Sequence, residues 1–299
     1  MSSEWEDAAA SRIKVKAPMP LQFSSPSNAP VSLLTEWLVA DADQLAAAIA
    51  WLYLQKQAQA MRVIQSLEPG AAALPGRVVQ DAIRALTVHT ADISNDLGSG
   101  DAAVRKAAED KLKTRIAHRD GLLFQHVSWI AAHLALPNTH AAPPHVRTAD
   151  KGFDGVVLEL DPATPALSRI ILCEDKASTD PRNLVTRNIW PEIEAIQASG
   201  KDREILAAVT AILATLPGID QEAVIEATAW EAARGFRVAL TAGADQARQS
   251  SYAHLFAGFD AAAGGNINSR MAEVMPIPDV RPYLADLANA VIAKLRAAP

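Results

Sequence analysis

One strand-forming run that ends in three charged residues constrains this chain more than any other stretch. Residues 169–178 read RIILCEDKAS, so apolar and β-branched residues lead directly into Glu174, Asp175 and Lys176. Successive side chains of a strand point to opposite faces, which puts Glu174 and Lys176 on one face and Cys173 with Asp175 on the other. The apolar residues predict a buried strand, and buried charges need a partner or a purpose. The fold therefore has to supply one at this position.

A second short strand precedes this run. The β-branched sequence GVVLEL at 155–160 is separated from RIILCEDK at 169–176 by the turn-rich DPATPALS, a pattern that predicts a β-hairpin. Asp154 stands just before the first strand, in KGFDG, where two glycines permit unusual backbone torsions. A long, twisted or bent pairing of the strands would bring Asp154 near Glu174. Two carboxylates beside an ammonium are suited to hold Mg²⁺ and to hydrolyse a phosphodiester.

These residues resemble the signature of the PD-(D/E)xK nuclease superfamily, in which a variable gap separates an Asp from a strand-borne Glu-x-Lys. The resemblance covers about Arg119–Gly243, and it departs from the family pattern at Phe153, where members often have proline. It implies a restriction-endonuclease-like fold. It further implies that Asp154 and Glu174 are ligands of Mg²⁺ or Mn²⁺, and that Lys176 orients the attacking water.

Members of this superfamily often carry a Glu or Gln that reaches the metal site from a helix before the signature strand. The stretch RDGLLFQHVSWIAAH resembles that helix, with Gln125 as the first candidate and His126 as the second. The combination RDGLLFQ, KGFDG and EDKAS also resembles the nuclease subunits of Hachiman-type and related helicase-linked anti-phage defence systems. This resemblance implies a Mg²⁺-dependent DNA endonuclease that acts as the effector of a bacterial defence or restriction complex.

The remaining patterns predict an α/β fold, in which a small mixed sheet is flanked by helices and preceded by a helical N-terminal region. We expect a flexible arm over residues 1–30, a helical region over 31–118 and the nuclease-like domain over 119–299. Within the helical region, the alanine-rich stretch 32–67 predicts one long helix or two consecutive helices. Further strands are expected at GFRVALTAG and near Met271–Pro278.

Charge and composition limit the partners. The net charge of −6 provides no global basic field for nucleic acid, so we expect a protein partner such as a helicase or sensor to deliver the nuclease to DNA. Arg182 and Arg187, which follow the Glu-x-Lys strand, are the candidate contacts to the DNA backbone. One cysteine and the lack of a long apolar run predict a cytoplasmic protein without disulfides or membrane contact. The sequence is compatible with a monomer or an oligomer.

Two other functions fit the same residues. The chain could be a non-catalytic scaffold of the same fold that binds partners through its alanine-rich helices, or a nuclease that cuts RNA. Without a metal, Asp154 would cap a turn, and Glu174 with Lys176 would form an ion pair worth a few tenths of a kcal/mol. Metal binding through Asp154 and Glu174 separates the nuclease from the scaffold.

Overall fold

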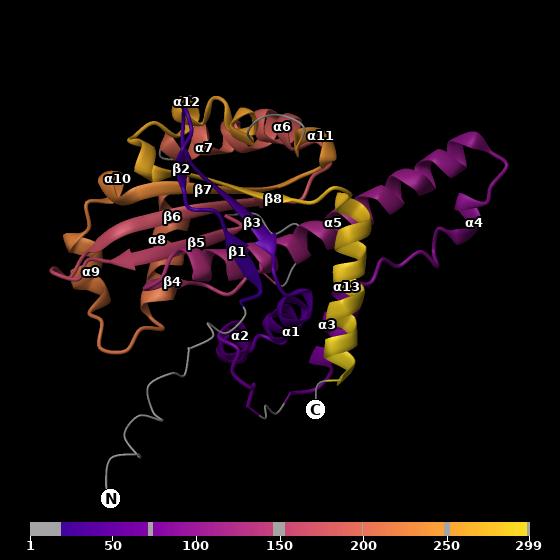
Figure 1. Cartoon of the computed structure of the whole chain (residues 1–299), viewed down its shortest axis with the longest axis horizontal. Coiled ribbons are helices and arrows are strands. Elements are labelled where there is room, and N and C mark those ends of the chain that lie inside the picture. The colour runs from indigo at the N-terminus through magenta and orange to yellow at the C-terminus, as the bar shows by residue number, and fades with distance from the viewer. Residues whose placement is uncertain (1–18, 71–73, 146–152, 199, 248–251, 298–299) are drawn as a thin grey trace, which may run out of the picture.

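A curled, mixed β-sheet forms the centre of the protein (Figure 1) in the computed structural model, which describes residues 19–70, 74–145, 153–198, 200–247 and 252–297. The strand order is β1-β3-β8-β7-β6-β5-β4, with β2 paired to β3. The strands are β1 (Leu21–Phe23), β2 (Ser27–Asn28), β3 (Leu33–Val39), β4 (Thr139–Ala141), β5 (Gly155–Leu160), β6 (Leu167–Lys176), β7 (Arg234–Ala242) and β8 (Arg270–Pro276). The predicted α/β class with a mixed, helix-flanked sheet is confirmed.

The strand directions follow from the connections. β5 and β6 form the predicted antiparallel hairpin, whereas β3, β8, β7 and β6 run parallel to one another. Parallel strands need long crossovers, and the segment between β6 and β7 supplies one as a series of helices. The strand expected at GFRVALTAG is β7, and the one expected near Met271 is β8.

Helices surround the sheet. They are α1 (Ala42–Tyr53), α2 (Gln57–Ile64), α3 (Val78–Leu86), α4 (Ser94–Leu97), α5 (Ala102–Ala135), α6 (Pro181–Leu184), η1 (Val185–Ile189), α7 (Trp190–Gln197), α8 (Asp202–Leu213), α9 (Gln221–Ala227), α10 (Trp230–Ala233), α11 (Ala244–Ala247), η2 (Tyr252–Phe256), α12 (Phe259–Ala263), η3 (Ile267–Ser269) and α13 (Val280–Ala297). None of those within the described ranges is long and apolar enough to cross a bilayer.

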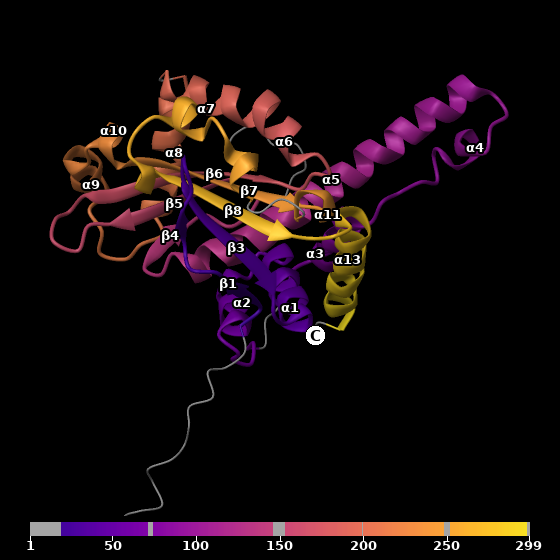
Figure 2. The same ribbon diagram turned by 45° about the horizontal axis from the view of Figure 1, so that its top comes forward.

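Side-chain alternation divides the hairpin between two cores. Leu158 and Leu172 belong to the core that helices α7, α8 and α12 cover on one face. Val157 and Ile171 point to the opposite face, where they pack with Ala132 of α5. Figure 2 shows α7 on one side of the strands and the inner part of α5 on the other. Because both faces are buried, the charged end of β6 is surrounded by the fold.

The prediction that residues 32–67 are helical is wrong over Leu33–Val39. This segment is β3, which pairs in parallel with β8 at the far end of the chain. The spacing of its apolar residues is compatible with a helix or with a strand, and pairing with the distant strand β8 favours the strand. The predicted flexible arm is likewise wrong over Leu21–Phe23 and Ser27–Asn28, which are strands β1 and β2; residues 1–18 lie outside the described residues.

The predicted boundary between residues 118 and 119 falls inside α5. This single helix has 34 residues and follows the N-cap residue Asp101, whose side chain accepts hydrogen bonds from two backbone N–H groups of the first turn. Its outer half projects from the body together with α4, while its inner half passes under the sheet (Figure 1). The helix therefore joins the predicted N-terminal region to the sheet rather than separating them.

Replacing Trp37 by alanine tests the place of β3 in the core. Its side chain is fully buried and stacks on Phe124 of α5, with ring centroids 5.9 Å apart. We expect Trp37→Ala to lower the free energy of unfolding by about 3–5 kcal/mol in urea denaturation. The control is Leu38→Ala, because Leu38 is the next residue on β3 but is 55% exposed, and its effect should stay within about 0.5 kcal/mol. Equal effects at both positions would contradict this placement.

Candidate functional site

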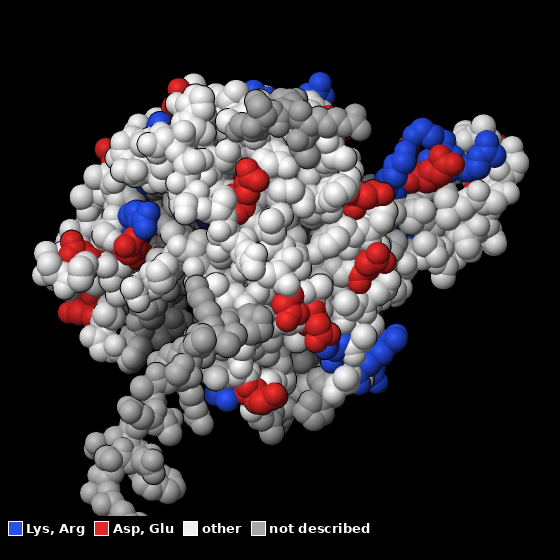
Figure 3. Space-filling model, in the orientation of Figure 1, with Lys and Arg blue, Asp and Glu red and all other residues white. Residues whose placement is uncertain are grey.

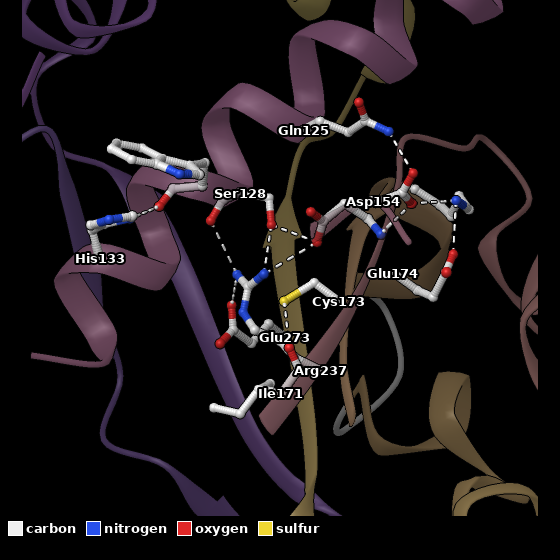
Figure 4. A network of polar contacts seen from close by, with 12 residues as sticks. Gln125, Ser128, His133, Asp154, Ile171, Cys173, Glu174, Arg237 and Glu273 are labelled. Carbon is white, nitrogen blue, oxygen red and sulfur yellow. Dashed lines mark hydrogen bonds and ion pairs between the residues drawn. The ribbon is translucent and has the colours of Figure 1, made fainter. Parts of the chain in front are cut away.

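The hairpin register places Asp154 beside Glu174. Gly155 pairs with Cys173, so the residues one step further out on each strand are Asp154 and Glu174. The Oδ2 atom of Asp154 accepts hydrogen bonds from Lys176 Nζ and from the Asp175 N–H, the latter at 2.9 Å. Lys176 Nζ also lies 2.9 Å from Glu174 Oε2. Ordinary antiparallel pairing thus brings the three predicted residues together (Figure 4).

The preceding helix contributes Gln125 to this group. From α5, its Nε2 donates a hydrogen bond to Asp154 Oδ1 at 2.5 Å. The amide nitrogen is the contacting atom, so Gln125 orients Asp154 here. The second candidate, His126, lies elsewhere: its ring stacks on Tyr53 of α1, with centroids 4.1 Å apart, and its Nδ1 is 2.8 Å from the Leu122 carbonyl oxygen. His126 is a core residue between helices.

Burial controls the protonation of the cluster. It raises the pKa of Glu174 to about 8, with the negative charge of Asp154 adding to the effect and Lys176 opposing it. Burial acts to lower the pKa of Lys176, but the Glu174 and Asp154 carboxylates outweigh it and raise that pKa above its usual value. Both pKa shifts act in the direction that favours a bound proton. A divalent cation competes with such protons when it binds carboxylates.

The carboxylates fit a hard divalent cation. Glu174 Oε1 is buried and has no hydrogen-bond partner in the structure, so this oxygen is available as a ligand. Mg²⁺ is usually held by one or two carboxylates, and water and substrate phosphate complete its coordination. Among the described residues no group of three or more His, Cys, Asp or Glu side chains is arranged to hold a metal. Asp154 and Glu174 supply two carboxylates, a number of protein ligands with which Mg²⁺ can be held when water completes its coordination.

Sequence reasoning missed a buried network on the opposite face of β6. Arg237 of β7 donates from Nη1 to Ser128 Oγ at 2.7 Å and to Asp175 Oδ1 at 3.2 Å, and from Nη2 to Glu273 Oε2 at 2.5 Å. Ser128 Oγ in turn donates to Asp175 Oδ1 at 2.6 Å. Burial raises the pKa of Asp175 to about 6, and Arg237 opposes that rise. The available signal was a lone charge in each of the apolar runs GFRVALTAG and MAEVM.

The two arginines predicted to contact DNA differ in their surroundings. Arg182 donates through Nη1 to the carbonyl oxygens of Leu255 and Ala257, at 3.1 and 2.8 Å, and so holds a loop of the fold. Arg187 is exposed on η1. Of the two arginines, only Arg187 therefore presents a solvent-exposed side chain.

Cys173 is a buried thiol on the face of β6 away from Glu174, and burial raises its pKa to about 12.

Basic residues of α5 are mixed with acidic ones on the projecting half of the helix (Figure 3). Lys106 Nζ lies 2.6 Å from Asp110 Oδ1, and Arg115 Nη1 lies 2.6 Å from Asp92 Oδ1. These pairs are solvent-exposed in large part, so each contributes little to stability. They also reduce the positive potential that this half of α5 offers to phosphates.

No protein-family model, curated protein or solved structure matches this chain. The function is therefore inferred from the geometry of the site.

Changing His126 tests its assignment to the core. Burial lowers its pKa from the usual 6.5 to about 4. Between these values the unfolded chain binds a proton at His126 that the folded chain does not, so the residue lowers stability as pH falls. We expect wild type to lose up to about 1.4 kcal/mol more per pH unit than His126→Gln between pH 6 and 5, measured by urea denaturation. A constant difference between the two proteins over this interval would contradict the assignment.

Proposed function

We propose that this chain is a metal-dependent nuclease with a restriction-endonuclease-like fold that hydrolyses DNA phosphodiester bonds. The observation that carries the proposal is the convergence of Asp154, Glu174 and Lys176 at paired strand ends, with Glu174 Oε1 buried and without a protein donor. The order of α5, the β5–β6 hairpin, a helical crossover and β7 supports it, because the resemblance implies such a helix and strand arrangement.

Each residue has a distinct role in this proposal. Asp154 and Glu174 hold Mg²⁺ or Mn²⁺, which when bound lowers the pKa of a water ligand and stabilises negative charge on the phosphate. An ammonium has three N–H donors, and Lys176 directs two of them to Asp154 and Glu174. The third remains for the attacking water or a phosphate oxygen. Gln125 fixes the orientation of Asp154.

The charge of the chain bears on how substrate reaches the site. The net charge is −6, and Arg182 is engaged by backbone carbonyls. We therefore include a protein partner in the proposal: a helicase or sensor of a cytoplasmic bacterial anti-phage defence complex that brings DNA to the nuclease. The same site chemistry applies to RNA, so the test of substrate includes both polymers.

Replacing Glu174 and Lys176 tests the assignment of catalysis. With Mg²⁺ or Mn²⁺, we expect wild type to cut supercoiled plasmid, and Glu174→Gln and Lys176→Met to cut at least roughly 100-fold more slowly, because each removes stabilisation of the reacting charges. The control is Glu159→Gln, which removes a carboxylate of the same hairpin that pairs with Arg169 outside the site. Gel assays of initial rates, with circular dichroism to confirm folding, give the comparison.

Three outcomes separate the alternatives. Cleavage of RNA alone, lost in the same two variants, would keep the chemistry and replace the substrate. Equal loss in Glu159→Gln would contradict the assignment of these residues. A folded wild type that cuts nothing, alone or with a candidate partner, and releases no heat with Mn²⁺ would contradict the nuclease proposal and favour the scaffold.

A further inference from the structure

The buried network behind the site joins one helix to four strands. Arg237 on β7 contacts Ser128 on α5, Asp175 on β6 and Glu273 on β8, and its guanidinium also lies 5.6 Å from the centroid of the Trp37 ring on β3. Arg237 is 1% exposed. Side chains of α5, β3, β6 and β8 thus converge on Arg237 of β7.

Stability alone is a weak reason for such a network. Removing three charged side chains from water is costly, and buried ion networks are often no more stable than apolar residues of similar size. Here Arg237 Nε also lacks a hydrogen-bond partner in the structure. A network of short, directional hydrogen bonds fixes the relative positions of the helix and strands that carry its members.

Two members of the network, Ser128 and Asp175, lie next to residues of the proposed site. Ser128 follows Gln125 by three positions on α5, which places both on the same side of the helix. Asp175 lies between Glu174 and Lys176, and its N–H donates to Asp154 Oδ2 at 2.9 Å while its carboxylate is held by Ser128 and Arg237. Figure 4 shows the two groups of contacts on either side of β6.

Packing between α5 and the hairpin is open at this point. A cavity of about 20 Å³ is lined there by residues that include Gln125, Asp154, Asp175 and Arg237. This volume is enough for about one water molecule. Apolar packing of α5 on the hairpin occurs at Ala132, one turn further along the helix. Beside the cavity, the helix contacts the hairpin end through the hydrogen bonds of Gln125 to Asp154 and of Ser128 to Asp175.

We propose that Ser128 and Arg237 are positioning residues, which lock α5 against β6 and so hold Gln125 in hydrogen-bonding reach of Asp154. Arg237 grips both the hydroxyl and the backbone carbonyl of Ser128, at 2.7 and 3.3 Å, so the helix is held by its main chain as well as by a side chain. The consequence for metal binding rests on the proposed function. The geometric consequence, the fixed approach of Gln125 and of the Asp175 N–H to Asp154, does not.

Ser128→Ala tests this inference with little change in volume, since it removes only the hydroxyl and retains the pairing of Arg237 with Asp175 and Glu273. The matched control is Thr114→Ala, which removes a hydroxyl from the exposed part of the same helix, where it donates to the Asp110 carbonyl. Three quantities are measured on the full chain: Mn²⁺ affinity by calorimetry, kcat and KM for plasmid cleavage, and hydrogen exchange of the Asp175 amide.

We expect Ser128→Ala to weaken Mn²⁺ binding by roughly 10- to 100-fold, the range usual for groups that orient metal ligands, and to lower kcat without raising KM. Its Asp175 amide should exchange at least roughly tenfold faster, because loss of the Ser128 hydrogen bond to the Asp175 carboxylate loosens the hydrogen bond from the Asp175 N–H to Asp154. In a Gln125→Ala background the additional loss of kcat should largely disappear, since both changes act through Asp154. Thr114→Ala should leave all values unchanged.

Wild-type values for Mn²⁺ affinity, kcat and Asp175 exchange in a folded Ser128→Ala protein would overturn the inference. So would losses in Ser128→Ala that are fully additive with those of Gln125→Ala. If wild type neither binds Mn²⁺ nor cuts, the proposed function fails, and exchange at Asp175 alone then decides the inference: acceleration supports the positioning role, and an unchanged rate overturns it.

Discussion

The antiparallel register of β5 and β6 is the constraint on which the rest of the site depends. With Gly155 opposite Cys173, Asp154 comes to lie beside Glu174, and a slip of one residue would turn every side chain of a strand to the other face. Both strands carry apolar side chains on both faces, as Leu172 and Ile171 show, so a slip would place each set against the core that is packed for the other set. The same burial that fixes the register also removes the charges at the strand end from water.

Those charges are tolerated because each face of β6 supplies partners. On one face Lys176 is shared by two carboxylates, and on the other Asp175 is held by Ser128 and Arg237. Groups held in this way inside a low-dielectric region do not have to reorganise when charge develops on a substrate, which is the condition for strong electrostatic stabilisation. The two networks meet at the Asp175 backbone, so the fold and the proposed chemistry are joined through a single residue.

The β5–β6 hairpin could be predicted from the sequence because its signals, apolar strand runs and a turn, are local. The approach of Glu174 and Lys176 to Asp154 follows from that hairpin, whereas Gln125 was expected only from the family resemblance. Strand β3 could not be predicted, since its partner β8 lies more than 200 residues away and the pattern of Leu33–Val39 allows a helix. The network around Arg237 escaped for a related reason. A single charge in an apolar strand does not reveal its partner, and here the partners are distributed over α5, β6 and β8.

The position of a bound cation tests the proposed site most directly. Crystals of the protein soaked with Mn²⁺ would be measured at a wavelength that gives anomalous scattering from manganese. If Asp154 and Glu174 hold the metal, a peak is expected in contact with carboxylate oxygens of both residues, and it should be lost in crystals of Glu174→Gln. A structure without a peak at these carboxylates at saturating Mn²⁺, or with an unchanged peak in the variant, would contradict the proposed site.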